Sequence, residues 1–205
     1  MIIHDFPQGS AAWCEARAGI PTASAFSKVI TPKTMQLSSQ ADAYENRCVF
    51  ERMTGSVIED FGGSAWTERG KEFEDEARAA YEFKKNVIVR RVGFVTNDLK
   101  TFGCSPDGLI GEDGGLELKC PSGTVHVGYL LSKTGAYDDY KAQVQGNMFV
   151  TGAKFWDVMS YHPEMRPSIY TATPDLEFHE KLRQLLAEFE ENVQRKIAFI
   201  SNLAS

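Results

Sequence analysis

Two acidic residues and a lysine lie close together in the glycine-rich stretch 104–121. Glu117 and Lys119 are two residues apart in a segment expected to form a strand, so their side chains leave the same face. Asp107 lies beside a proline and a glycine, and a turn through Gly111–Gly115 would return its carboxylate to Glu117. Two converging carboxylates suit a hard cation such as Mg²⁺, which takes oxygen ligands and keeps several waters. With Lys119 nearby, the predicted chemistry is metal-assisted attack of water on a phosphodiester.

By itself this pattern also fits a hairpin with a surface ion pair, but further motifs accompany it in order. They are W-x-x-x-R-x-G-I-x-T-A-S at 13–24, R-G-K-x-x-E-x-x-A-R at 69–78 and A-Q-V-Q at 142–145. Together with S-P-D-G-L and G-L-E-L-K-C-P, these blocks resemble the PD-(D/E)xK nuclease superfamily. Within that superfamily the sequence is similar to the bacteriophage lambda-type recombination exonucleases, of the YqaJ-like viral recombinase family. The resemblance covers residues 13–151, about two thirds of the chain.

The resemblance implies an α/β fold with a restriction-endonuclease-like PD-(D/E)xK core, in which helices flank a central mixed β-sheet. The length of 205 residues and the absence of a linker or repeat predict a single nuclease domain over 1–205. Apolar periodicity predicts helices over 42–54, 69–83 and 139–151, and a long C-terminal helix over 175–200 packed on the core. Short apolar runs predict strands at 87–95, 101–105, 116–119, 154–161 and 169–172. The polar or glycine-rich segments 31–41 and 55–68 predict loops.

Four catalytic roles follow from the resemblance, each on a residue that matches the family motifs. Asp107 and Glu117 would bind the metal together with the backbone carbonyl of Leu118. Lys119 would be the lysine of the active-site triad. Gln143, the first glutamine of A-Q-V-Q, matches a helix residue that supports the active site.

A further acidic residue is expected on the helix over 69–83. The buried stripe formed by Phe73, Ala77, Ala80 and Tyr81 places Glu74 at one edge. Glu76 lies almost as near the other edge, so helix geometry leaves both open, and a solvated helix face is the alternative for either. The resemblance favours Glu74 as the additional metal-site and catalytic acid.

Arg17, Ser24 and Ser105 match positions that surround the 5′-terminal phosphate of DNA in this family. An arginine fork suits a phosphate, and a serine near a helix N-terminus adds donors. For Arg17 the alternative is a surface ion pair. For Ser24 it is an ordinary helix N-cap, a role compatible with phosphate binding.

Two departures from the family pattern concern DNA gripping and strand separation. Segment 31–41 is shorter and less basic than a DNA-gripping loop would be, and Lys33 is its clear cation. Trp66 stands where the family can insert an apolar side chain into the duplex end, so it would stack on bases as a wedge. Partial burial in the core is the alternative for Trp66.

The formal net charge of −6, from 22 basic and 28 acidic residues, argues against a protein that coats DNA non-specifically. The acidic surplus is uneven, because residues 59–82 contain eight acidic and three basic side chains. This segment surrounds the helix expected to supply Glu74, where bound Mg²⁺ would offset part of the charge. The composition is therefore compatible with a nuclease that engages DNA through a few placed cations and its metal.

Other classes of site and location are disfavoured. The four cysteines at 14, 48, 104 and 120 are too scattered for a metal pair or an iron–sulfur cluster, and the four histidines form no ligand pair. No P-loop motif indicates an ATP-driven motor. No apolar run reaches the roughly 18 residues of a membrane span, and the N-terminus does not resemble a secretory signal. These absences favour the cytoplasm, and the resemblance implies a bacterial host with a phage or prophage as the source.

The leading hypothesis is a Mg²⁺-dependent 5′-to-3′ exonuclease, with Mn²⁺ able to substitute. It would digest one strand of linear double-stranded DNA from a 5′-phosphorylated end to mononucleotides, leaving a 3′ overhang. The resemblance also implies a homotrimeric ring and a phage-type single-strand annealing protein as partner. The alternatives are another PD-(D/E)xK endonuclease or repair nuclease, and a catalytically silent DNA-binding or scaffold module on the same fold.

Overall fold

The computed structural model describes the backbone of residues 1–58 and 65–203 and the side chains of residues 1–58 and 73–203. The first half of the chain contains β1 (Ile2–His4), α1 (Ala11–Arg17), the 3₁₀ helix η1 (Ala23–Lys28), β2 (Ile30–Thr31), β3 (Gln36–Leu37), α2 (Ala41–Thr54) and α3 (Ala65–Lys85). The second half contains β4 (Val89–Arg90), β5 (Phe94–Thr96), β6 (Gly103–Cys104), β7 (Gly108–Ile110), β8 (Gly114–Lys119), α4 (Gly123–Leu131), α5 (Tyr137–Thr151), β9 (Phe155–His162), β10 (Met165–Ala172) and α6 (Leu176–Leu203).

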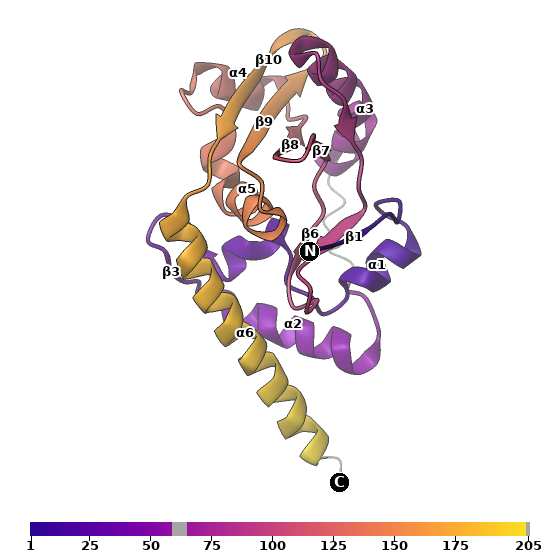
Figure 1. The fold of residues 1–205 in the computed structure, drawn as a ribbon, viewed down its shortest axis with the longest axis vertical. Helices are drawn as coiled ribbons and strands as arrows, with labels where there is room; N and C mark the ends of the chain where they lie inside the picture. The colour runs from indigo at the N-terminus through magenta and orange to yellow at the C-terminus, as the bar shows by residue number, and fades with distance from the viewer. Residues whose placement is uncertain (59–64, 204–205) are drawn as a thin grey trace.

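A five-stranded sheet in the order β10-β9-β8-β7-β4 forms the centre of the molecule (Figure 1). The sheet is mixed, because β8 and β9 run parallel while the other neighbours are antiparallel. Gly108 on β7 lies against β4 so closely that a Cβ there would collide with the side chain of Val89. A mixed α/β architecture with a central sheet is thus confirmed.

Helices cover the two faces of this sheet. Leu116 and Leu118 pack with Ala77 and Tyr81 of α3, as the alternation of side chains along β8 predicts. On the other face α5 packs against β9, and side chains of both elements share one apolar cluster. Glu117 points to the α5 face and is only 1% exposed, since α5 covers it. The predicted acid therefore lies in the interior rather than on a solvated surface.

A second layer joins η1, α2 and α6 beneath the three-stranded sheet β1-β5-β6. On α6, Phe189 is buried with its ring centroid 5.4 Å from that of Tyr44 on α2. Beyond Val193 this cover becomes partial, since Ile197 still packs against the cluster whereas Phe199 is 65% exposed. The predicted C-terminal helix therefore packs on the core along its first part, whereas its end projects from the molecule (Figure 1).

Four local expectations are corrected by the structure. The predicted strand 87–95 is two short strands, β4 and β5, in different sheets. The predicted loop 31–41 contains parts of the β2–β3 hairpin, and α3 begins at Ala65, inside the predicted loop 55–68. Helix α4 was not predicted, because apolar side chains such as Val125, Val127 and Leu131 are exposed and form no buried stripe.

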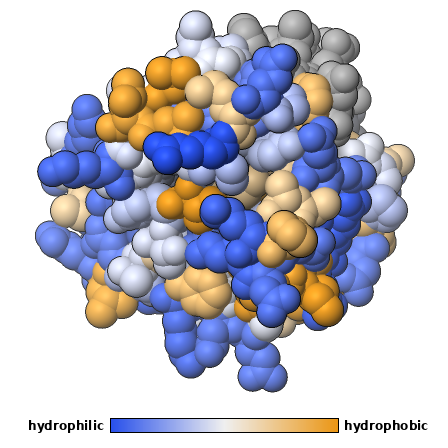
Figure 2. Space-filling model, turned by 90° about the horizontal axis from the view of Figure 1, so that it is seen from above, coloured by the Kyte–Doolittle hydropathy of each residue, from blue (hydrophilic) through white to orange (hydrophobic). Residues whose placement is uncertain are grey.

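The surface above the sheet is mixed in character. The face seen in Figure 2 is mainly hydrophilic, with apolar residues in separate groups. Among the described residues, no helix combines the length and apolar composition needed to cross a membrane.

Candidate active site

The residues of the predicted triad meet at the β7–β8 hairpin. On β8, Nζ of Lys119 lies 2.7 Å from Oε1 of Glu117. Asp107 immediately precedes β7, and its Oδ2 accepts a 2.6 Å hydrogen bond from the N–H of Leu118. The turn between the two strands thus brings Asp107 beside Glu117, as the glycine-rich sequence predicts.

Helix α5 fixes the carboxylate of Glu117 from the opposite side. The side-chain amide of Gln143 donates to Oε1 at 2.6 Å, and that of Asn147 donates to Oε2 at 3.0 Å. These two residues are four apart and share one face of the helix. Gln143 was predicted from the sequence and Asn147 was not. The spacing of four residues from Gln143 is the feature of the sequence that indicates Asn147. Lys119 also lies 4.2 Å from the centroid of the Tyr140 ring.

The electrostatics of the triad favour an added cation. Burial and the charge of Glu117 raise the pKa of Asp107 to about 7. Burial by itself would lower the pKa of Lys119, but the charges of Glu117 and Asp107 overcome it and raise that pKa. Lys119 is therefore protonated at neutral pH, and two carboxylates share this single ammonium. A divalent cation would relieve the repulsion between them.

The donor set fits a metal that keeps water ligands. Among the residues that the structure describes, no three His, Cys, Asp or Glu side chains stand close enough together to hold a metal ion. A cation at Asp107 and Glu117 would thus need backbone oxygens and water, as Mg²⁺ accepts. A carboxylate offers about four lone-pair sites. Glu117 uses three of them on Lys119, Gln143 and Asn147, so one direction stays open.

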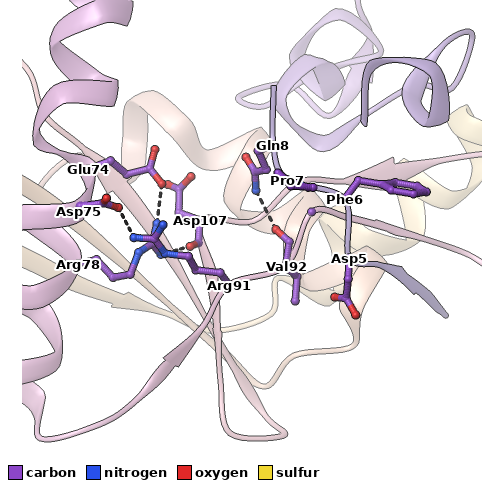
Figure 3. A pocket seen from close by; sticks show the side chains of 11 residues that line it. Asp5, Phe6, Pro7, Gln8, Glu74, Asp75, Arg78, Arg91, Val92 and Asp107 are labelled. Atoms are coloured by element: carbon purple, nitrogen blue, oxygen red, sulfur yellow. Dashed lines mark hydrogen bonds and ion pairs between the residues drawn. The ribbon is translucent and has the colours of Figure 1, made fainter. Parts of the chain in front are cut away.

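Glu74 lines a cavity of about 530 Å³ together with Asp107, and the two carboxylates point toward one another (Figure 3). Buried Arg78, one helical turn further, donates to Oε1 of Glu74 at 2.5 Å and also to the backbone carbonyl of Asp107. Burial and the charge of Asp107 raise the pKa of Glu74. Glu76 instead accepts a 2.6 Å hydrogen bond from Tyr161. Of the two acids left open by helix geometry, the structure brings Glu74 to the site.

A second polar cluster surrounds Arg17. Its guanidinium donates to Oγ of Ser105 at 2.6 Å and to Oγ1 of Thr22 at 3.4 Å. It also stacks over Trp13, 4.1 Å from the ring centroid, and the Trp13 indole donates to Ser105 at 3.0 Å. The hydroxyls of Thr22 and Ser24 are 3.3 Å apart. The three predicted residues are therefore gathered together, and Trp13 and Thr22, which lie in the same motif, join them.

This arrangement excludes two of the alternatives. The recorded partners of Arg17 in the described part of the chain are hydroxyls and aromatic rings, so it is not a surface ion pair. Its burial lowers its pKa from the ordinary value. Ser24 is not an N-cap, because Thr22 precedes η1 and Ser24 lies inside it. A partly buried guanidinium that has no carboxylate partner among the described residues can donate hydrogen bonds to an anion.

Of the two remaining predicted DNA contacts, the structure describes the side chain of Lys33 and not that of Trp66. Lys33 is exposed in the turn between β2 and β3. No hydrogen bond or ion pair within the described residues joins it to the triad or to Arg17. The side chain of Trp66 falls outside the described residues, so its role as a wedge stays a prediction.

The chain belongs to the YqaJ-like viral recombinase family, since the sequence model of that family's domain matches residues 12–154. This confirms the family inferred from the four motif blocks. A comparison with curated proteins gave no significant match.

Three solved structures, of two proteins, are similar to this chain. The alkaline exonuclease LHK-Exo from Laribacter hongkongensis is 26% identical, with a TM-score of 0.82, and the match covers 95% of this chain and 98% of that one. The same protein in complex with dAMP matches at 27% identity, with the same TM-score and coverage. A phage-related exonuclease from Haemophilus somnus 129PT shares the fold at 14% identity and a TM-score of 0.71, over 88% of this chain and 96% of that one.

Proposed function

We propose that this protein is a Mg²⁺-dependent 5′-to-3′ exonuclease, built on a restriction-endonuclease-like PD-(D/E)xK core. It digests one strand of linear double-stranded DNA from a 5′-phosphorylated end to mononucleotides and leaves a 3′ overhang. The observation that carries this proposal is the adjacency of the two polar clusters. Ser105, which binds Arg17, and Asp107 of the triad are separated by one residue, so their Cα atoms lie at most about 7 Å apart.

The Arg17 cluster fits the terminal phosphate of the strand that is digested. Arg17 is oriented by Trp13 and by the hydroxyls of Ser105 and Thr22, so its fork is held in place before substrate binds. A phosphate bound there would put the next phosphodiester within reach of Asp107, because the spacing between the Arg17 cluster and Asp107 is on the scale of one nucleotide. Cleavage at that position releases a mononucleotide. The complex of LHK-Exo with dAMP supports this product, because that relative shares the fold.

Asp107, Glu117 and the backbone carbonyl of Leu118 are proposed to hold the metal, with Glu74 as the additional acid. Bound Mg²⁺, or Mn²⁺ in its place, would lower the pKa of a coordinated water and polarise the phosphodiester. Lys119 is charged and directed at Glu117, so its ammonium can donate to a phosphate oxygen or to the attacking water. Gln143 and Asn147 keep the Glu117 carboxylate in one orientation.

The test uses Mg²⁺ and three DNA substrates: linear duplexes with 5′-phosphate or 5′-hydroxyl ends, and a closed circle. We expect mononucleotides from the phosphorylated duplex, slower digestion of the hydroxyl end and an intact circle. Cutting of the closed circle would instead indicate an endonuclease. Asp107→Asn is expected to abolish digestion while DNA binding persists, and activity in that variant would overturn the metal assignment.

The assembly and partner follow from the family and are part of the same proposal. Three copies would form a closed ring around the duplex, and a phage-type single-strand annealing protein would take up the 3′ overhang in the cytoplasm of the bacterial host. Light scattering of the purified protein should give the mass of three chains. A monomer at all concentrations would reject the ring without affecting the assignment of the catalytic residues.

A further inference from the structure

The cavity beside the triad has an unusual balance of charge for a DNA enzyme. Among the residues that the structure describes, four acidic side chains line it: Asp5, Glu74, Asp75 and Asp107. Within the same described residues, the cations in its lining are Arg78 and Arg91. Arg78 is buried and committed to Glu74 and to the Asp107 carbonyl. Among the described residues that line the cavity, Arg91 is thus the exposed cation, with 60% of its side chain accessible.

Arg91 is held in a pair that water can reach. Its guanidinium binds the carboxylate of Asp75, whose side chain is 75% exposed (Figure 3). Exposed pairs of this kind contribute little stability, so another anion can replace the carboxylate at small cost. A second pair of the same type, at 3.8 Å, joins Arg90 on β4 to Asp5, which follows β1 and lines the same cavity.

We propose that Arg91 binds a backbone phosphate of the DNA at the mouth of this cavity, and that the phosphate displaces Asp75. This inference rests on the proposed function, since it assigns a further DNA contact to that site. A polyanion entering a cavity lined by carboxylates needs an exposed cation close to Asp107, and the planar fork of arginine matches phosphate. This contact is separate from the Arg17 cluster, which holds the terminal phosphate.

The exchange gives the two partners opposite effects on DNA binding. Loss of Arg91 removes its attraction for the DNA phosphate and should weaken binding. Loss of the Asp75 charge removes a competitor for Arg91 and a repulsion toward the phosphate. A purely structural ion pair predicts instead that both losses act alike, because either one breaks the same pair.

The experiment measures binding of a 5′-phosphorylated duplex by fluorescence anisotropy with Ca²⁺ in place of Mg²⁺, over a range of NaCl concentrations. The variants are Arg91→Ala, Asp75→Asn and the double variant. Arg183→Ala and Glu180→Gln serve as matched controls, because this pair on α6 has both side chains 61% exposed. Exonuclease rates with Mg²⁺ are measured in parallel.

Arg91→Ala should raise Kd several-fold and make the slope of log Kd against log salt shallower by about 0.7–0.9, the value of one phosphate contact. Asp75→Asn should lower Kd, and this gain should be smaller in the double variant, where only the relief of repulsion between Asp75 and the phosphate remains. The control pair should leave Kd and slope unchanged. The inference is overturned if Arg91→Ala keeps the wild-type slope, if Asp75→Asn weakens binding, or if the wild-type protein does not bind DNA. If the variants bind DNA with the expected slopes but the wild-type protein digests no DNA, the proposed exonuclease activity is rejected and the Arg91 contact stands.

Discussion

Replacing Asn147 by alanine tests whether the orientation of Glu117 limits the reaction. The amide of Asn147 is the donor that the structure gives to Oε2 of Glu117, whereas Oε1 receives both Lys119 and Gln143. Without Asn147, one oxygen of a carboxylate that is 1% exposed loses its partner. The carboxylate is then free to rotate about its last bond and to lose its alignment with Asp107.

The size of the effect follows from the kind of bond removed. A hydrogen bond to a charged group contributes about 1.5–3 kcal/mol. If that energy is expressed fully in the transition state, kcat/KM falls about 10- to 150-fold. We expect the loss mainly in kcat, together with a higher Mg²⁺ concentration for half-maximal rate, because DNA is held elsewhere. The assay is release of mononucleotides from a 5′-phosphorylated duplex across a Mg²⁺ titration.

Gln145 provides the matched control. It lies on the same helix, is equally buried, and makes three hydrogen bonds, to Tyr137, to the Thr173 carbonyl and from the N–H of Asp175. Gln145→Ala should therefore destabilise the fold at least as much as Asn147→Ala, with little change in the Mg²⁺ requirement. If both variants lose equal activity at a temperature where both are folded, Asn147 supports only the fold and the reasoning fails.

Three further predictions test the phosphate cluster, the charge of the triad and the C-terminal helix. Arg17→Lys keeps the charge but loses the fork, so the preference for 5′-phosphate over 5′-hydroxyl ends should fall at least about tenfold in paired rate measurements. The pKa of Asp107 is raised from 3.8 to about 7, so the metal-free protein should lose stability as pH rises between those values, and Asp107→Asn should abolish this loss in thermal melts. Phe189→Ala should cost about 3–5 kcal/mol in denaturant unfolding, whereas Phe199→Ala, at an exposed position, should change stability by less than about 0.5 kcal/mol.

The triad could be predicted from the sequence because local geometry builds most of it. Glu117 and Lys119 share a face through the period of a strand, and a short hairpin returns Asp107 to them. Asn147 could not be assigned in the same way. Its contact with Glu117 depends on how α5 packs on the sheet, and that packing is set by apolar side chains from several elements. The choice between Glu74 and Glu76 likewise needed the position of Arg78 and Tyr161.

The parts of the fold that were missed lack a periodic signal. Strand β4 has two residues, too few for alternation to register, and it is separated from β5 at Gly93. A Cβ at Gly93 would collide with the backbone at Phe6. At this point the chain leaves one sheet for the other, and the contact that requires glycine comes from a segment remote in sequence. The change of sheet depends on tertiary contacts, so it could not be predicted from the continuous apolar run 87–95.

The net charge of −6 is compatible with DNA binding because of where the charges lie. Two acids of the site are paired with cations, the buried Glu117 with Lys119 and the half-buried Glu74 with Arg78, and this pairing reduces the field that an approaching strand meets. The two cations proposed to bind the substrate lie close to the Ser105–Asp107 stretch, since Arg17 donates to Ser105 and Arg91 lines the same cavity as Asp107. A non-specific coat needs many exposed cations, whereas recognition of a strand end needs a few that are oriented. Under the proposed function, the acidic composition would weaken binding along the duplex and leave intact the contacts that select its 5′ end.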